Sequence, residues 1–149
     1  MPTPESVLRA WFDGVWNRGD ESTIDRLMNG ETVIHGLPTP DGQPIRGPHN
    51  FRPFYQAFRT AFPDISVEIL NVVTQGSLAV ARCRVTGTQR GALPECQATG
   101  LPVTFEGFAM CQVDGDRVAA AWNCFDFLSM YKQLGAEISP PPIRRAAGA

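Results

Sequence analysis

Apolar residues recur at helical spacing near the start of the chain. They form one stripe, made of Leu8, Trp11, Phe12, Val15 and Trp16. Thr3 before Pro4 is a typical helix start, because the threonine hydroxyl can cap the first turn and proline needs no hydrogen-bond partner there. Gly19 is a typical helix end, and Asp20 can cap a second, short helix. The pattern therefore predicts two helices within residues 3–28.

A third helix gives the strongest amphipathic signal in the sequence. Its apolar residues lie three or four positions apart on one face: Phe51, Phe54, Tyr55, Phe58 and Phe62. Asn50 can cap this helix, Pro53 falls in its first turn, and Pro63 ends it. Residues 32–35 predict a short strand before it, and the Gly- and Pro-rich residues 36–48 predict a loop.

From Ile65 onward the apolar residues alternate with polar ones, which is typical of strands. Two strands meet at a turn around Gly76, and a long loop over 91–102 follows them. Residues 103–113 and 117–125 then predict a hairpin around Asp114-Gly115. A two-residue loop at that point places Trp122 opposite Gly107. A last helix is expected over 127–134.

These elements predict an α+β fold, with helices gathered on one side of a curved antiparallel sheet. An aromatic helix laid across such a sheet leaves a cone, and the mouth of the cone is a natural pocket. We expect a single domain over residues 1–138 and a disordered tail over 139–149, which is rich in proline and small residues.

Charge, apolar runs and cysteine spacing exclude several classes of binding partner. The chain has 149 residues and a formal net charge of −2, without a cluster of basic residues in its body. This argues against nucleic acid as a partner. The sequence contains neither a membrane-spanning apolar run nor a secretion signal, which favours a cytoplasmic protein without a membrane partner. The four cysteines form no C-x-x-C pair, so we expect no metal site.

Several short motifs, in this order, resemble the SnoaL-like polyketide cyclases of the NTF2-like superfamily. Residues 15–20 resemble the family's first turn between helices, 34–35 its first strand with a histidine, 61–64 the end of its third helix, and 85–88 a later strand. The ending carries Trp122-Asn123-x-x-Asp126 followed by Gln133-Leu134-Gly135, and the motifs are specific for the family only together and in this order. Typical members carry Trp-Asp/Asn-x-x-Asp there. The resemblance covers about Val7 to Gly135.

The resemblance implies ring closure of a polyketide by intramolecular aldol condensation, without a metal or another cofactor. The family's catalytic aspartate corresponds to Asp126, which would remove a proton from a carbon that neighbouring carbonyls activate. His35 could polarise a carbonyl or orient Asp126. Asp126 also precedes a helix, so a purely capping role is the alternative. Trp16, Tyr55 and Trp122 are candidate substrate-binding residues for a small hydrophobic, polycyclic carbonyl ligand.

Other functions on the same fold stay open, because a fold does not fix a reaction. An isomerase acting on an apolar carbonyl compound uses the same acid/base chemistry. A non-catalytic ligand-binding protein, a cofactor-free oxygenase and an epoxide hydrolase are the alternatives. We also expect a homodimer, as the resemblance implies. In the expected register, the sheet face opposite Trp122 is too apolar for open solvent: Phe108, Met110, Ala119 and Ala121.

Overall fold

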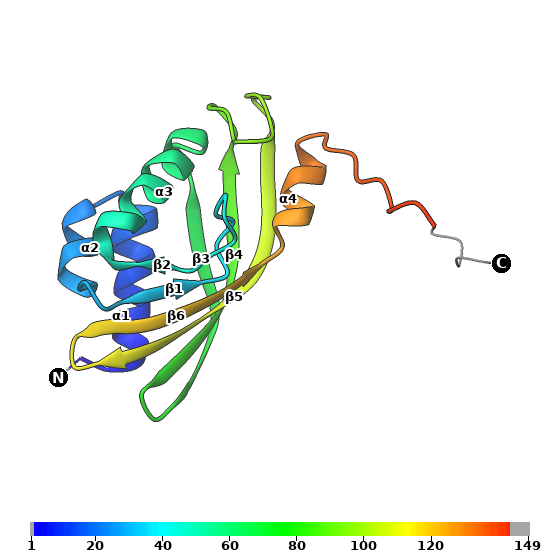
Figure 1. The fold of residues 1–149 in the computed structure, drawn as a ribbon. Helices are drawn as coiled ribbons and strands as arrows, with labels where there is room; N and C mark the ends of the chain where they lie inside the picture. Colours follow the sequence, from blue (N-terminus) through cyan, green and yellow to red (C-terminus); the bar gives the residue numbers. More distant parts are fainter. Residues whose placement is uncertain (1, 144–149) are drawn as a thin grey trace.

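The computed structural model describes residues 2–143. Four helices and one π-helical segment accompany a single curved sheet of six strands (Figure 1). In chain order the elements are α1 (Pro4–Trp11), η1 (Phe12–Asn17), α2 (Glu21–Leu27), β1 (Val33–His35), β2 (Ile45–Arg46), α3 (Gly47–Ala61), β3 (Ser66–Gln75), β4 (Leu78–Thr88), β5 (Pro102–Asp114), β6 (Arg117–Phe125) and α4 (Phe127–Gln133).

The predicted helix starts at Thr3 and Asp20 are confirmed. The Thr3 hydroxyl accepts a hydrogen bond from the backbone N–H of Ser6, and the Asp20 carboxylate accepts one from Ser22. Helix α1 continues directly into the wider turns of η1, which bury Trp16. This places the apolar stripe of the first helix against the sheet.

Helix α3 begins earlier than predicted. Its first residue is Gly47, and Arg46 precedes it without a side-chain cap, so the expected cap at Asn50 is wrong. Pro48 takes the first turn, where its missing N–H costs little. The predicted aromatic face is confirmed, since Phe51, Tyr55 and Phe58 are buried. In Figure 1 this helix lies across the open side of the sheet.

The sheet is mixed rather than fully antiparallel, which corrects one part of the prediction. Its strand order is β2-β1-β6-β5-β4-β3. The short strand β1 runs parallel to β6, with His35 opposite Trp122. Strand β2 lies within the expected loop 36–48 and pairs with β1. The α+β class and the curved sheet are confirmed.

The register of the β5–β6 hairpin differs from the prediction. Asp114 pairs with Arg117, so the loop consists of Gly115 and Asp116, and Gly115 takes a positive φ of 64° at the first loop position. A bulge between Gln112 and Val113 shifts the register once more. The glycine at position 107 therefore faces Phe125 instead of Trp122.

This shift reverses the faces of the last strand. Trp122 and Cys124 lie on the outer face of the sheet, where they pair with Met110 and Phe108. Ala121 lies on the inner face and helps to line a hollow there. The expected separation of Trp122 from Phe108 and Met110 is therefore wrong.

The end of the chain is only partly described. Helix α4 ends at Gln133, and residues 134–143 form no further helix or strand. The last six residues of the expected tail, 144–149, lie outside the described residues. None of the helices described between residues 2 and 143 has the length and apolar character needed to cross a membrane.

Candidate functional site

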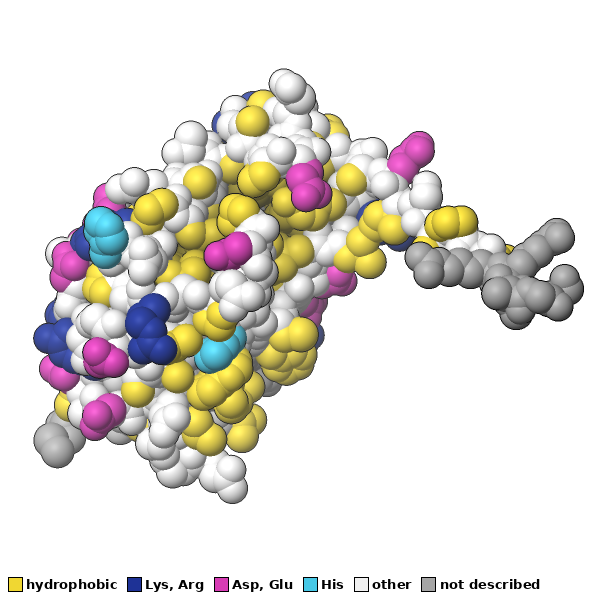
Figure 2. All heavy atoms as spheres, viewed as in Figure 1, with side chains coloured by type: hydrophobic (Ala, Val, Ile, Leu, Met, Phe, Trp, Pro, Cys, Tyr) yellow, Lys and Arg dark blue, Asp and Glu magenta, His cyan; other side chains and the backbone are white. Residues whose placement is uncertain are grey.

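The inner face of the sheet, η1 and α3 enclose two adjoining hollows of about 520 and 420 Å³, counting the space at their open mouths. Figure 2 shows hydrophobic side chains gathered around a hollowed region between α3 and α4. Both hollows are lined by Phe12, Trp16, Leu37 and Asn123. Because they share these residues, the two hollows adjoin each other, and we describe them together as one site.

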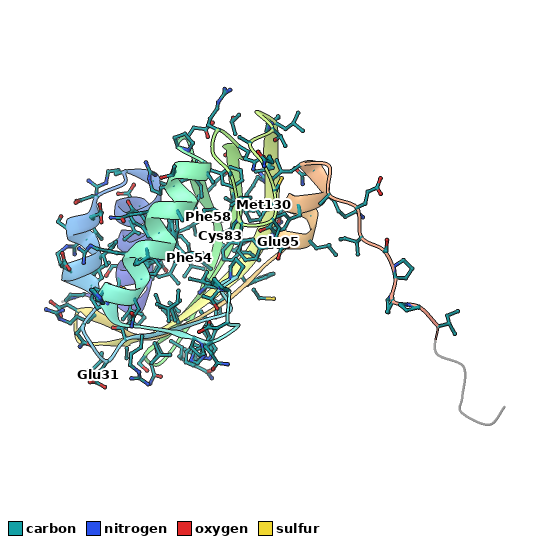
Figure 3. All side chains as sticks on the ribbon, turned by 45° about the horizontal axis from the view of Figure 1, so that its top comes forward. Glu31, Phe54, Phe58, Cys83, Glu95 and Met130 are labelled. Atoms are coloured by element: carbon teal, nitrogen blue, oxygen red, sulfur yellow. The ribbon has the colours of Figure 1, made fainter. Side chains whose placement is uncertain are left out.

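The walls of this site are almost entirely apolar. The hollow nearer α1 adds residues from the helices and from β1, β5 and β6: Leu8, Trp11, Met28, Ile34, Phe51, Ala109, Met110, Cys111, Val118 and Ala121. The other hollow adds Phe54, Phe58, Ile65, Val67, Val85, Phe105, Phe125 and Phe127. Phe54 and Phe58 lie on the side of α3 that faces the sheet (Figure 3).

Trp16 is the predicted binding residue that the structure places in the site. Its ring makes edge contacts with Phe54 and Phe58, with ring centroids 6.5 and 5.8 Å apart. Arg59 fixes the same segment by donating a hydrogen bond of 2.6 Å to the backbone oxygen of Trp16. The indole is therefore held rigidly at the junction of the two hollows.

Tyr55 and Trp122 do not line either hollow. Tyr55 is buried beside Trp16, with ring centroids 5.3 Å apart, and burial raises the pKa of its hydroxyl. Trp122 is 38% exposed on the outer face of the sheet. Their roles in binding stay predictions that the geometry of the lining does not support.

Asp126 lies at the start of α4, outside the lining. Its side chain is exposed, and its carboxylate accepts a hydrogen bond of 2.9 Å from the backbone N–H of Ser129. This is the capping geometry that the sequence offered as the alternative. The catalytic role of Asp126 stays a prediction.

His35 is also outside the lining. Its ring stacks on Trp122 of the neighbouring strand, with centroids 5.5 Å apart and planes 6° from parallel. The backbone oxygen of His35, however, accepts a hydrogen bond of 3.0 Å from the side-chain amide of Asn123. His35 therefore touches the site through its backbone, and a catalytic role for its ring stays a prediction.

Asn123 is the polar residue that the sequence reasoning missed. Among the described residues that line the two hollows, it carries the only side-chain oxygen or nitrogen apart from the indole N–H groups of Trp11 and Trp16. The signal was present in the sequence, because Asn123 stands at the Asp/Asn position of the Trp-Asp/Asn motif. The wrong hairpin register concealed it, since it turned Trp122 inward.

Titratable side chains are scarce in the lining of the two hollows. Of the described lining residues, Cys111 is the only one with a titratable side chain, and burial raises the pKa of its thiol to about 11. The site therefore presents a neutral thiol, aromatic rings and one amide near neutral pH. Within residues 2–143, no group of three or more His, Cys, Asp or Glu side chains is arranged to hold a metal ion.

Comparison with known proteins assigns the family. The model of the SnoaL-like polyketide cyclases matches residues 6–134, so the chain belongs to this family. No curated protein matches the sequence significantly.

Solved structures share the fold. IdmH of Streptomyces antibioticus, a candidate polyketide cyclase, is 26% identical and has a TM-score of 0.77, with 91% of this chain and 100% of IdmH covered. A candidate SnoaL-like polyketide cyclase from Jannaschia sp. CCS1 is 20% identical, with a TM-score of 0.78 and 93% of each chain covered. AclR of Streptomyces galilaeus, a candidate hydroxylase, is 18% identical, with a TM-score of 0.75 and 89% and 95% of the chains covered. The fold is thus shared by proteins that are assigned different reactions.

Proposed function

We propose that this protein binds a small, flat, apolar carbonyl compound in the hollow beneath α3 and promotes its ring closure or isomerisation without a cofactor. The observation that carries this proposal is the continuous apolar lining with a single amide, at Asn123. Apolar walls with one or a few polar groups are typical of small-molecule sites. The family to which the chain belongs, and the polyketide cyclase description of IdmH, support the choice of a carbonyl compound.

The enclosure can act on such a ring closure by holding the two reacting ends of one molecule together. Correct positioning alone can contribute up to about 7–11 kcal/mol to lowering a barrier. The carbon that must lose a proton is acidified by the substrate's own carbonyls. The amide of Asn123 can form a hydrogen bond with a polar group of the bound compound, although it cannot take up a proton.

Ligand binding without catalysis is a second candidate, and one observation favours it. No carboxylate or imidazole lines the hollows among the residues that the structure describes. A general base is worth roughly 10²–10⁴-fold in rate. A site without one holds its ligand well but has less means of moving a proton.

Neighbouring alanines on β6 provide a matched test of binding. Ala121 lines the hollow, whereas Ala120 lies opposite Gln112 on the outer face. With 2-acetylnaphthalene as the probe, Ala121→Phe should weaken binding by tenfold or more, measured by calorimetry. Ala120→Phe should leave the dissociation constant unchanged. Equal affinity of both variants would show that the compound does not bind in the hollow.

Hydrogen exchange separates the two candidates. The probe is 2-tetralone, which is a ketone in water and carries an acidic hydrogen on the carbon between its carbonyl and its aromatic ring. If the protein promotes enolisation, the loss of that hydrogen into heavy water should accelerate when the compound is bound and return to the free rate in Ala121→Phe. Binding without acceleration would favour the non-catalytic candidate.

A further inference from the structure

The amide of Asn123 has a defined orientation. It approaches the backbone oxygen of His35 at 3.0 Å. A carbonyl oxygen can only accept a hydrogen bond, so the amide atom that faces it is the nitrogen Nδ2. The other polar atom of the side chain, Oδ1, is therefore left to face a different partner.

The anchor of this amide cannot easily move. Strand β1 pairs in parallel with β6 through His35 and Trp122, directly beside Asn123. Gly36 follows with a φ of 83°, and a Cβ atom at this position would fall 1.9 Å from the backbone oxygen of Asn123. The chain thus passes closely over Asn123, and this contact fixes the carbonyl of His35 against the amide.

The oxygen Oδ1 is available to a ligand. Among the described residues, none donates a hydrogen bond to it, yet no non-exposed residue there has a fully buried side-chain oxygen or nitrogen without a partner. Oδ1 is therefore accessible, and Asn123 lines both hollows. The residues around it are apolar, so water competes little for a hydrogen bond formed there, and the bond contributes more to the binding free energy.

We propose that Oδ1 of Asn123 accepts a hydrogen bond from a hydroxyl group of the ligand, and that the site therefore selects an enol or a phenol. This rests on the proposed binding of a flat apolar compound in the hollow. A ketone or an ether offers only acceptors and cannot satisfy Oδ1, whereas an enol or phenol hydroxyl donates to it. For a compound with two neighbouring carbonyls, the site would hold the enol form.

Two naphthalenes of similar shape test the proposal. At neutral pH, 2-naphthol donates a hydrogen bond, whereas 2-methoxynaphthalene only accepts one. Asn123→Leu removes the acceptor and should weaken 2-naphthol selectively. We therefore expect the dissociation constant of 2-methoxynaphthalene divided by that of 2-naphthol to fall roughly 3- to 10-fold. Leu37→Ala is the matched control, because Leu37 lines both hollows without a polar atom. Leu37→Ala should weaken the binding of both compounds by the same factor and leave the ratio unchanged.

A measurement on the unaltered chain avoids any loss of folding in Asn123→Leu. The ¹⁵N resonance of the Asn123 side-chain amide should shift when 2-naphthol binds and should shift much less with 2-methoxynaphthalene. If both compounds bind but the ratio is the same in Asn123→Leu, or both shift the resonance equally, the proposal is wrong and binding in the hollow stands. If neither compound binds, the proposed function fails and this inference fails with it.

Discussion

Asp126 occupies the position where an acid can cap a helix or act on a substrate. In the structure its carboxylate is bonded to the backbone N–H of Ser129, and its side chain is absent from the lining. Asparagine caps a helix about as well as aspartate but cannot take up a proton. The two roles can therefore be separated by one substitution.

We expect Asp126→Asn to change the free energy of unfolding by less than about 1 kcal/mol, because the cap remains. Asp126→Ala should cost about 0.5–2 kcal/mol, because it removes the cap. If the structure shows the whole role of this residue, Asp126→Asn should also leave hydrogen exchange of bound 2-tetralone unchanged. A rate loss of a hundredfold with an unchanged melting temperature would instead assign Asp126 as the general base.

Gly107 is needed where β5 passes closely over the aromatic ring of Phe125. It pairs with Phe125, and a Cβ atom at position 107 would lie 2.4 Å from Cδ1 of that ring. We expect Gly107→Ala to lower the free energy of unfolding by about 1–3 kcal/mol, through the strain of overpacking. Gly30→Ala is the control in urea unfolding, since a Cβ atom there has no neighbour within 4 Å and should change stability by less than about 0.5 kcal/mol.

A single position of register decides which residue of Trp122-Asn123 enters the site. Successive side chains of a strand point to opposite faces, so an error of one residue exchanges the two faces completely. The sequence correctly indicated a hairpin and a glycine opposite a large side chain. It could not show that the loop begins at Gly115 rather than Asp114, or that a bulge follows, because both depend on how the sheet twists over the core.

At the scale of elements, the loop between β4 and β5 is bonded to one buried side chain, that of Gln89. Gln89 is fully buried, and its Oε1 accepts hydrogen bonds from the backbone N–H and the hydroxyl of Thr99, at 3.1 and 2.7 Å. Its Nε2 donates to the backbone oxygen of Cys96 at 3.4 Å. The loop that the sequence predicted over 91–102 is thus anchored at Thr99 and Cys96 to the side chain of Gln89.

Removing the polar contacts of Gln89 should loosen the loop. Gln89→Leu keeps the size of the side chain but leaves Thr99 and Cys96 without their partner, at a cost of about 1–3 kcal/mol. We expect faster proteolytic cleavage between residues 91 and 101 than in the unaltered protein. Gln97→Leu is the control, because Gln97 is exposed in the same loop. Equal cleavage of both variants would show that the polar contacts of Gln89 do not order the loop.

The long elements and the short strand β1 were predictable, whereas the edge strand β2 was not. Helix α3 and strands β4 and β5 each bury a regular apolar pattern, and that pattern is local to the sequence. Strands β1 and β2 have three and two residues, and β2 lies in a stretch rich in glycine and proline. Such short strands exist because the neighbouring strand offers hydrogen bonds, which is a property of the folded chain.

At the scale of the whole molecule, two buried thiols couple stability to pH. Cys83 and Cys111 lie in the core, and burial raises the pKa of each thiol from 9.0 to about 11. Between these values the folded chain keeps the two protons and the unfolded chain releases them. The free energy of unfolding should therefore fall as the pH rises from 9 to 11, by roughly 2–3 kcal/mol for each thiol.

Urea unfolding at several pH values between 8 and 10.5 checks this expectation. Cys83→Ala or Cys111→Ala should lower stability at pH 8, because each removes buried volume, but should flatten its decline with pH. Cys124→Ala is the matched control, because Cys124 is exposed, and it should leave the slope unchanged. A slope that is the same in all three variants would exclude the buried thiols as its cause.

The outer face of the sheet exposes large apolar side chains that lie close together. Phe108 is 53% exposed and Trp122 is 38% exposed. Cys124 lies opposite Phe108 in the pairing of β5 with β6, and Met110 lies opposite Trp122. A contiguous apolar patch of this kind is typical of an interface. Two copies of the chain could cover it by a twofold axis, the commonest arrangement of soluble oligomers.

We therefore expect a homodimer through this face, and light scattering at micromolar concentration measures it. Trp122→Glu should convert the dimer to a monomer, because a dry interface cannot accommodate an unpaired charge. Leu128→Glu is the control, since Leu128 is 56% exposed on α4 and lies outside the sheet. The Leu128→Glu variant should remain a dimer. A monomeric unaltered chain would refute the interface, and so would a dimer that survives Trp122→Glu. In either case the stack of His35 on Trp122 would be a surface contact of a single chain.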